Sequence, residues 1–166
     1  MIRNAIALPV IGFLVCSCAN TRTVDVKIKD KLISVIRDEC RDTSSSNTEL
    51  HNECVINLNT VIDGTWKETY VFSPAATNEE INEAIGSKIA ASDKITRKVV
   101  VRGDNEVLRY EEFNANLEEF VDHDVVFDDI DPITHHAVFD RDSAFQVEVN
   151  TNKNGTFYRL KCVNCR

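Results

Sequence analysis

Glycine and proline are scarce in this chain of 166 residues, which contains five glycines and three prolines. Collagen-like polymers and many disordered tails are rich in these residues, whereas 43% of this sequence is hydrophobic. The composition therefore indicates a folded chain and argues against both of those classes. The length fits one domain of ordinary size that can bury a real core.

Three well-known catalytic signatures are also absent. The chain has no Gly-rich phosphate loop, no His-Glu-x-x-His zinc helix and no Gly-x-Ser-x-Gly nucleophile elbow. Its four histidines and many serines could assemble a triad in space, and paired carboxylates could carry out acid–base chemistry, but the sequence singles out none of them. We therefore expect a non-catalytic protein with no catalytic residue. An envelope hydrolase or a metal-dependent enzyme is the alternative.

The apolar run at residues 5–15 is too short to span a membrane. It lies between Arg3 and the small-residue stretch 16–19, which is the three-part arrangement of a secretory signal. The sequence Val15-Cys16-Ser17-Cys18 resembles a bacterial lipobox. That resemblance implies cleavage before Cys18, a diacylglyceryl anchor on its thiol and attachment to a membrane through the lipid.

The lipobox resemblance sets the expected domain organisation. We expect a signal peptide at 1–17, a lipidated N-terminus and short tether at 18–23, and a single domain at 24–166. The small residue Ala19 after the cysteine implies an outer-membrane destination facing the periplasm. Ordinary cleavage after Ala19 is the competing interpretation, and it would give a soluble periplasmic or secreted protein.

Four further cysteines follow, and an exported protein meets an oxidising compartment that favours disulfides. Three connectivities exist. We predict a bond between Cys40 and Cys54, which would close a Ser-rich loop, and this leaves Cys162 and Cys165 as a small ring. A redox motif would need its cysteine pair at the start of a helix, and a four-cysteine zinc site would need tighter spacing in the first pair.

Two hairpins are predicted from strand patterns around turn residues in the second half of the chain. The C-terminal one turns at Asn154-Gly155, and counting outward pairs Val149 with Leu160 on the inner face and Glu148 with Lys161 on the outer face. The other spans residues 95–113 and turns at Gly103-Asp104-Asn105.

The remaining elements lie in the first half of the chain. We predict a hairpin at 54–72 around Asp63-Gly64, and a helix at 78–91 that Thr77 and Glu80 open in capping-box spacing. Residues 24–41 fit a strand followed by a helix of about three turns. The expected fold class is α+β, a mainly antiparallel β-sheet built from hairpins with one or two packed helices.

Charge is concentrated in one segment, residues 118–142, which holds nine carboxylates and a single basic residue, Arg141. The net charge of this acidic segment, −8, equals the formal charge of the whole chain. Such a field can steer a basic envelope protein and makes nucleic acid an improbable ligand. A solvated acidic surface ribbon is the simpler interpretation. The candidate partner-binding residues are Asp122, Asp124, Asp128, Asp129, Asp131, Asp140 and Asp142.

The acidic segment also contains an internal echo. His-Asp-Val-Val-Phe-Asp at 123–128 recurs as His-His-Ala-Val-Phe-Asp at 135–140, which predicts two equivalent short strands with their phenylalanines on the core side. Weak metal candidates are His123, His135, Asp128 and Asp140. Carboxylates outnumber imidazoles, so Ca²⁺ is the alternative to the expectation of no cofactor. Function is therefore expected to be protein binding, with an inhibitor or immunity protein against a basic toxin as one version.

Overall fold

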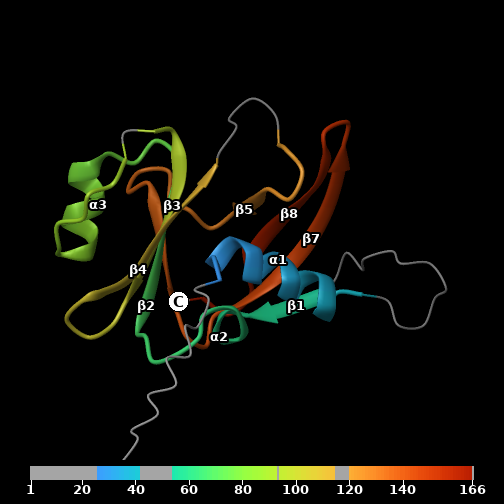
Figure 1. Cartoon of the computed structure of the whole chain (residues 1–166), viewed down its shortest axis with the longest axis horizontal. Coiled ribbons are helices and arrows are strands. Elements are labelled where there is room, and N and C mark those ends of the chain that lie inside the picture. The colour runs from blue at the N-terminus through green and yellow to red at the C-terminus, as the bar shows by residue number, and fades with distance from the viewer. Residues whose placement is uncertain (1–25, 42–53, 93, 115–119, 166) are drawn as a thin grey trace, which may run out of the picture.

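Two four-stranded sheets and three helices make up the described part of the chain (Figure 1). The computed structural model describes residues 26–41, 54–92, 94–114 and 120–165. The helices are α1 (Ile28–Glu39), α2 (Leu58–Val61) and α3 (Asn78–Ile85). The strands are β1 (Cys54–Asn57), β2 (Glu68–Phe72), β3 (Thr96–Arg102), β4 (Val107–Asn114), β5 (Val125–Phe127), β6 (His136–Asp140), β7 (Ala144–Asn152) and β8 (Gly155–Cys162).

The strands are arranged in two mainly antiparallel sheets. Sheet I has the order β1-β7-β8-β5, and sheet II has the order β4-β3-β2-β6. Every adjacent pair is antiparallel except β5 and β8, which run parallel. The expected α+β fold class, mainly antiparallel with packed helices, is therefore confirmed. None of the helices in the described ranges is long and apolar enough to cross a membrane.

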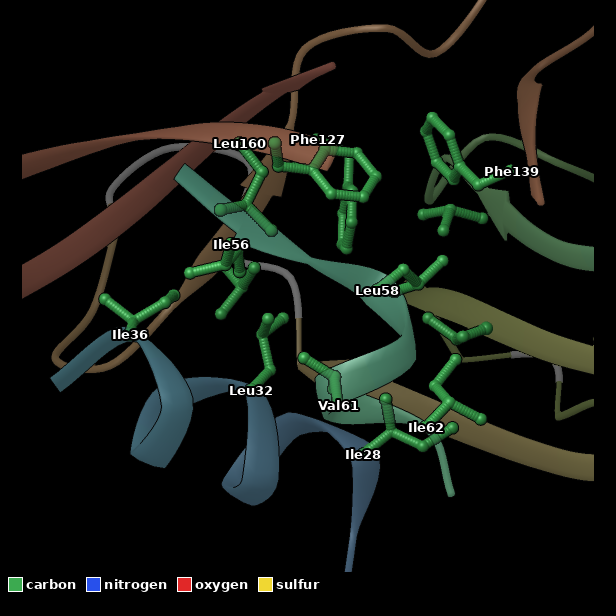
Figure 2. Close-up of a cluster of buried hydrophobic side chains, with 14 of the residues drawn as sticks. Ile28, Leu32, Ile36, Ile56, Leu58, Val61, Ile62, Phe127, Phe139 and Leu160 are labelled. Atoms are coloured by element: carbon green, nitrogen blue, oxygen red, sulfur yellow. The ribbon is translucent and has the colours of Figure 1, made fainter. Parts of the chain in front are cut away.

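The main hydrophobic core lies between α1 and the inner faces of the two sheets (Figure 2). Ile28, Leu32 and Ile36 recur every four residues along α1, so they share one face of the helix. Figure 2 shows this face directed towards Ile56, Val61 and Ile62. Three phenylalanine rings from both sheets meet above them: Phe127, Phe139 and Phe145, with the last two centroids 4.8 Å apart. The core thus joins both sheets into one body.

Helix α3 covers the opposite face of sheet II and forms a second, smaller core. The predicted capping box is present, because Thr77 Oγ1 accepts the N–H of Glu80 and the Glu80 carboxylate accepts the N–H of Thr77. The helix ends at Ile85 and not at Ala91. Gly86 adopts a left-handed φ of 63°, which terminates the helix and which glycine adopts without a steric penalty.

The prediction for residues 24–41 is confirmed for the helix. Helix α1 has three turns, whereas Val26 and Lys27 form no strand, and Val24 lies outside the described residues. Glu111 on β4 accepts the backbone N–H groups of Ile28 and Lys29 at 2.5 and 3.2 Å. A distant carboxylate therefore satisfies N–H groups at the start of α1 that have no partner within the helix.

The C-terminal hairpin is confirmed, but its register differs by two residues from the prediction. Val149 pairs with Tyr158 and not with Leu160. The strands close at Asn152 and Gly155, because Gly155 adopts a φ of 130° and belongs to β8 instead of to the turn. The two turn residues therefore lie one position earlier in the chain than the predicted pair, Asn154 and Gly155.

The outer face of this hairpin shows the same displacement. Glu148 pairs with Arg159, whereas Lys161 pairs with Gln146. A displacement of two residues leaves each side chain on its original face, since side chains alternate with a period of two. Cys162 accordingly packs against the main core, as the predicted inward orientation requires.

The predicted hairpin at 54–72 is wrong. Strand β1 pairs with β7 in sheet I, and β2 pairs with β3 and β6 in sheet II, so the two segments belong to different sheets. Between them the chain forms α2 and a turn that contains Gly64 at a φ of 85°. The apolar residues on both sides of that turn, Val61, Ile62 and Trp66, are used by the core beneath α1.

Two further predictions are confirmed. Strands β3 and β4 form the expected hairpin around Gly103, with a register shift between Val101 and Arg102. The internal echo forms two strands, β5 and β6, whose Phe127 and Phe139 both lie in the main core. The two copies lie in different sheets, so the echo builds one strand of each layer.

Both predicted disulfides are present. Cys40 after α1 is bonded to Cys54 at the start of β1, and Cys162 at the end of β8 is bonded to Cys165. The first bond fixes the helix to the edge of sheet I at a point where Cys40 is itself buried. Cys18 and the signal-like residues lie outside the described part of the chain.

Candidate functional site

Residues 120–142 of the acidic segment contain β5, β6 and the turns beside them, and their carboxylates differ widely in exposure, whereas Glu118 and Glu119 lie outside the described residues. Residues 128–135, which connect β5 to β6, are called the acidic turn. Asp128 accepts Arg159 Nη2 at 3.0 Å, and Asp129 accepts the backbone N–H of Cys162 at 2.6 Å. Both carboxylates therefore hold the first half of the acidic turn against β8.

Asp131 fixes the second half of the acidic turn. Its Oδ1 accepts the backbone N–H groups of Ile133 at 2.6 Å and Thr134 at 2.9 Å, while its carbonyl accepts the N–H of His135 at 2.9 Å. The hydrogen bonds from Thr134 and then Ile133 lower the pKa of Asp131, because they stabilise the ionised form. The Asp131 carboxylate thus organises the backbone around Ile133.

Ile133 is 84% exposed, the most exposed of the large hydrophobic residues in the described ranges. The turn beneath it is pinned by three aspartates, so the side chain is held out from the surface by an ordered backbone. A large apolar side chain in a polar, charged rim is typical of the centre of a protein interface.

The last two aspartates of the segment fix the turn between β6 and β7. Asp140 Oδ1 accepts the hydroxyl of Ser143 and the N–H of Asp142, both at 3.0 Å. The carbonyl of Asp142 accepts the side-chain amide of Asn164 at 2.8 Å. Both carboxylates remain exposed at the surface, so they can add to the negative field there.

Asp122 contacts the C-terminal hairpin. Its Oδ1 accepts the backbone N–H of Thr156 at 2.9 Å, and its Oδ2 lies 3.1 Å from His123 Nδ1. The carboxylate reaches this position because Gly155 has no side chain: an added Cβ would collide with Asp122. The close approach explains why the glycine lies in the strand at this point.

Asp124 is fully buried, so the prediction that it contacts a partner is wrong for this residue. Its Oδ1 accepts the N–H of Val125 at 2.9 Å and lies 3.5 Å from Nη1 of Arg97, which comes from β3. The same Nη1 donates to the carbonyl of Val125 at 2.5 Å. This ion pair joins sheet I to sheet II in the protein interior.

The weak metal candidates are spread over separate contacts. His123 Nε2 contacts the guanidinium of Arg37, and His135 Nδ1 lies 3.4 Å from Glu80 Oε1. Guanidinium only donates hydrogen bonds, so Nε2 of His123 is the acceptor and Nδ1 carries the proton that faces Asp122. No group of three or more potential metal ligands occurs among the residues described by the structure.

The two histidines share one unusual backbone feature. His123 and His135 both have a φ of 59°, in the left-handed region that non-glycine residues rarely adopt. They occupy equivalent positions in the internal echo: His135 directly precedes β6, and His123 lies two residues before β5. The repeated sequence therefore encodes a repeated reversal of the chain as well as a repeated strand.

A polar cluster beneath the start of α3 was missed by the sequence analysis. Glu112 on β4 accepts the hydroxyl of Ser92 at 2.6 Å, the N–H of Ser92 at 3.0 Å, Thr96 Oγ1 at 3.3 Å and the Tyr110 hydroxyl. Burial raises the pKa of Glu112, but these donors outweigh it and lower the pKa to about 2. Burial and then Glu112 raise the pKa of Tyr110.

A pocket of about 510 Å³ lies between the start of α1 and the end of β4. Its lining contains three cations, Lys27, Lys29 and Arg37, three carboxylates, Asp30, Glu111 and Glu112, and the imidazole of His123. Two of these carboxylates are engaged, since Glu111 binds the start of α1 and Glu112 binds the polar cluster. This mixture of positive and negative side chains favours neither an anionic nor a cationic ligand.

In comparisons with known proteins, no family model, no curated protein and no solved structure matches the chain.

Proposed function

We propose that this chain is an exported, lipid-anchored bacterial envelope protein whose non-catalytic domain binds a basic protein partner through the acidic turn. The observation that carries the proposal is the 84% exposure of Ile133 on a turn whose backbone three aspartates hold in place. Binding would bury this isoleucine at the centre of the interface, while the surrounding carboxylates would steer and orient the partner.

The chemistry of the partner follows from the turn. Ile133 requires an apolar pocket, and the carboxylates of Asp128, Asp129 and Asp131 require lysines or arginines at its rim. A basic envelope protein has that chemistry, and a basic secreted toxin that this chain would inhibit is one version. Association should weaken as salt is raised, because exposed charges are screened within about 8–10 Å at physiological ionic strength.

The binding test uses a charge-removing triple variant, Asp128→Asn, Asp129→Asn and Asp131→Asn. The amide oxygen of asparagine can still accept the backbone N–H groups, so the turn is retained while its charge is removed. Wild-type protein should retain a basic partner in a low-salt pull-down from envelope extract, and the triple variant should lose it.

A matched control removes three exposed charges elsewhere: Asp38→Asn, Glu39→Gln and Asp104→Asn. This variant has the same change in net charge, and it should retain the partner as well as the wild type does. Equal retention by both triple variants would contradict the assignment of the acidic turn as the binding surface.

The lipid anchor and the proposed outer-membrane location are supported by the lipobox-like residues 15–18 and by Ala19. Intact mass of protein from the membrane fraction of its own host tests the anchor. We expect a chain that starts at Cys18, carries a lipid-sized increment and gains four hydrogens when its two disulfides are reduced. An unlipidated chain starting at Asn20 would instead make this a freely diffusing exported protein.

A further inference from the structure

A second pocket, of about 390 Å³, lies beside the start of α3 and is distinct from the acidic turn. It is formed where the chain before α3 approaches the segment that leads into β3. Its lining combines apolar side chains with two lysines, and only one carboxylate contributes. The lining residues are Pro74, Ala76, Thr77, Asn78, Glu79, Ser92, Lys94, Ile95 and Lys98.

Lys98 is the unusual residue of this pocket, because its side chain is charged and the residue is only 3% exposed. Its Nζ donates to the carbonyls of Lys94 and Thr96, both at 3.4 Å. Within the described ranges, no carboxylate oxygen forms an ion pair with this ammonium. An ammonium has three N–H donors, and burying one is costly unless an anion compensates the charge.

Glu112 does not supply that anion. It lies directly opposite Lys98 in the β3–β4 pairing, on the same face of sheet II. Both of its oxygens are nevertheless occupied by donors from Ser92, Thr96 and Tyr110. Lys98, one of the residues that line the pocket, thus carries a buried ammonium with no paired carboxylate in the described part of the chain, which points to an anion from outside.

The apolar part of the lining indicates what the anion is attached to. Ile95 is 62% exposed beside the pocket, and Pro74 and Ala76 contribute further apolar surface. Glu79, the acidic member of the lining, is exposed to solvent. The pocket therefore offers one buried positive charge and a partly apolar wall, which suits a ligand with one negative charge and a small apolar group.

We propose that this pocket binds a carboxylate carried on a small apolar group, with the carboxylate on Lys98 Nζ and the apolar group against Ile95 and Pro74. Two sources share this chemistry: the C-terminus of a peptide ending in an aliphatic residue, and a free short-chain carboxylic acid. The proposal is independent of the acidic turn. The outcome of the ligand-binding test at this pocket therefore does not decide whether the acidic turn binds a protein partner, and the reverse also holds.

The test titrates the chain, as purified from its host, with isovalerate and with N-acetyl-Ala-Leu, and follows binding by calorimetry and by amide chemical shifts near Ser92 and Thr96. Isovaleramide and the C-terminal amide of the peptide are the matched controls, because they lack only the charge. Binding of either acid without its amide supports the proposal and identifies the source. Absence of binding by both acids, or equal binding of acids and amides, overturns it.

Two variants locate the binding. Lys98→Met removes the buried charge with little change of volume, and it should weaken binding by roughly tenfold or more while thermal unfolding shows a folded chain. Ile95→Asp adds a repelling charge at an exposed position and should have the same effect, whereas Val55→Asp, at an exposed position on β1, should bind as the wild type does. Unchanged binding by Lys98→Met and Ile95→Asp would overturn the site.

Discussion

Arg97 Nη1 and Asp124 Oδ1 lie 3.5 Å apart in the protein interior and connect the two sheets. The aspartate is fully buried and the arginine is 7% exposed. Burial lowers the pKa of Arg97, and the nearby charge of Asp124 opposes that effect. Each charge is therefore tolerated in the interior because the other is present.

We predict that Asp124→Asn lowers the free energy of unfolding by about 3–5 kcal/mol, because removal of one partner leaves the other charge buried without compensation. Chemical denaturation measures the change. Asp128→Asn is the control, since Asp128 pairs with Arg159 at the surface and such pairs contribute no more than about 1 kcal/mol. Similar losses in both variants would contradict the proposed structural role of the buried pair.

A second prediction concerns Glu112 and acid stability. Its pKa is about 2 in the folded chain, below the ordinary value of 4.5, so folding favours its ionised form. Glu112 therefore contributes stability above pH 4.5, and this contribution is lost as the pH falls from 4.5 through about 2. The unscreened difference corresponds to about 3 kcal/mol at 1.36 kcal/mol for each pH unit, and solvent screening of this partly exposed carboxylate reduces the expected contribution to about 1–2 kcal/mol.

Glu112→Gln should flatten the dependence of unfolding free energy on pH in this range, because the amide does not titrate. Glu79→Gln, at an exposed position outside the hydrogen-bonded cluster, should leave the wild-type profile intact. Denaturant titrations at several pH values between 2 and 5 measure both profiles. A Glu112→Gln profile as steep as the wild type would show that other groups dominate the acid response.

A third prediction concerns the approach of Asp122 to Gly155. Alanine at position 155 would adopt a left-handed φ and would also collide with the carboxylate. At Gly64 the φ is 85° and an added Cβ meets no atom within 4 Å, so Gly64→Ala is a control that carries the backbone strain alone. Strain of this kind costs about 1–3 kcal/mol.

Gly155→Ala should therefore destabilise the chain more than Gly64→Ala does. Removal of the colliding carboxylate in the double variant Asp122→Ala, Gly155→Ala should recover the part of the loss that comes from the collision, which a double-mutant cycle measures. Strict additivity of the two single changes would show that Asp122 and Gly155 are not coupled.

Local signals in the sequence were sufficient to predict several elements. The capping box at Thr77, the hairpin turn at Gly103 and the four-residue spacing in α1 all depend on neighbouring residues, and the structure contains each of them. Pairing of Cys40 with Cys54 was predictable for the same reason, because the two cysteines are only 14 residues apart in the sequence.

Pairings between distant segments were not predictable in the same way. The parallel contact of β5 with β8 and the separation of β1 from β2 depend on which apolar faces meet across the core, and many arrangements satisfy one hydrophobic pattern. The register error at Gly155 has a related cause. The position of the turn depends on the approach of Asp122, which lies far away in the sequence.

The candidate sites show the same division. The sequence identified the acidic segment, but it could not separate the buried Asp124 from the exposed aspartates of the acidic turn. Arg97 and Lys98 are two adjacent charges at the start of a strand that continues Val-Val-Val, and this pattern was a visible signal of buried charge. Their partners and the pocket beside Lys98 come from other segments, so only the fold reveals them.

The central claim is that Ile133 on the acidic turn contacts a protein partner, and site-specific photo-crosslinking in the native host tests it most directly. A photoreactive residue replaces Ile133 in one strain and Val55 in another, since Val55 is also exposed, at 51%, but lies on β1. We expect one discrete adduct with a basic envelope protein from position 133 and none from position 55. No adduct from position 133, or the same adducts from both positions, would contradict the account.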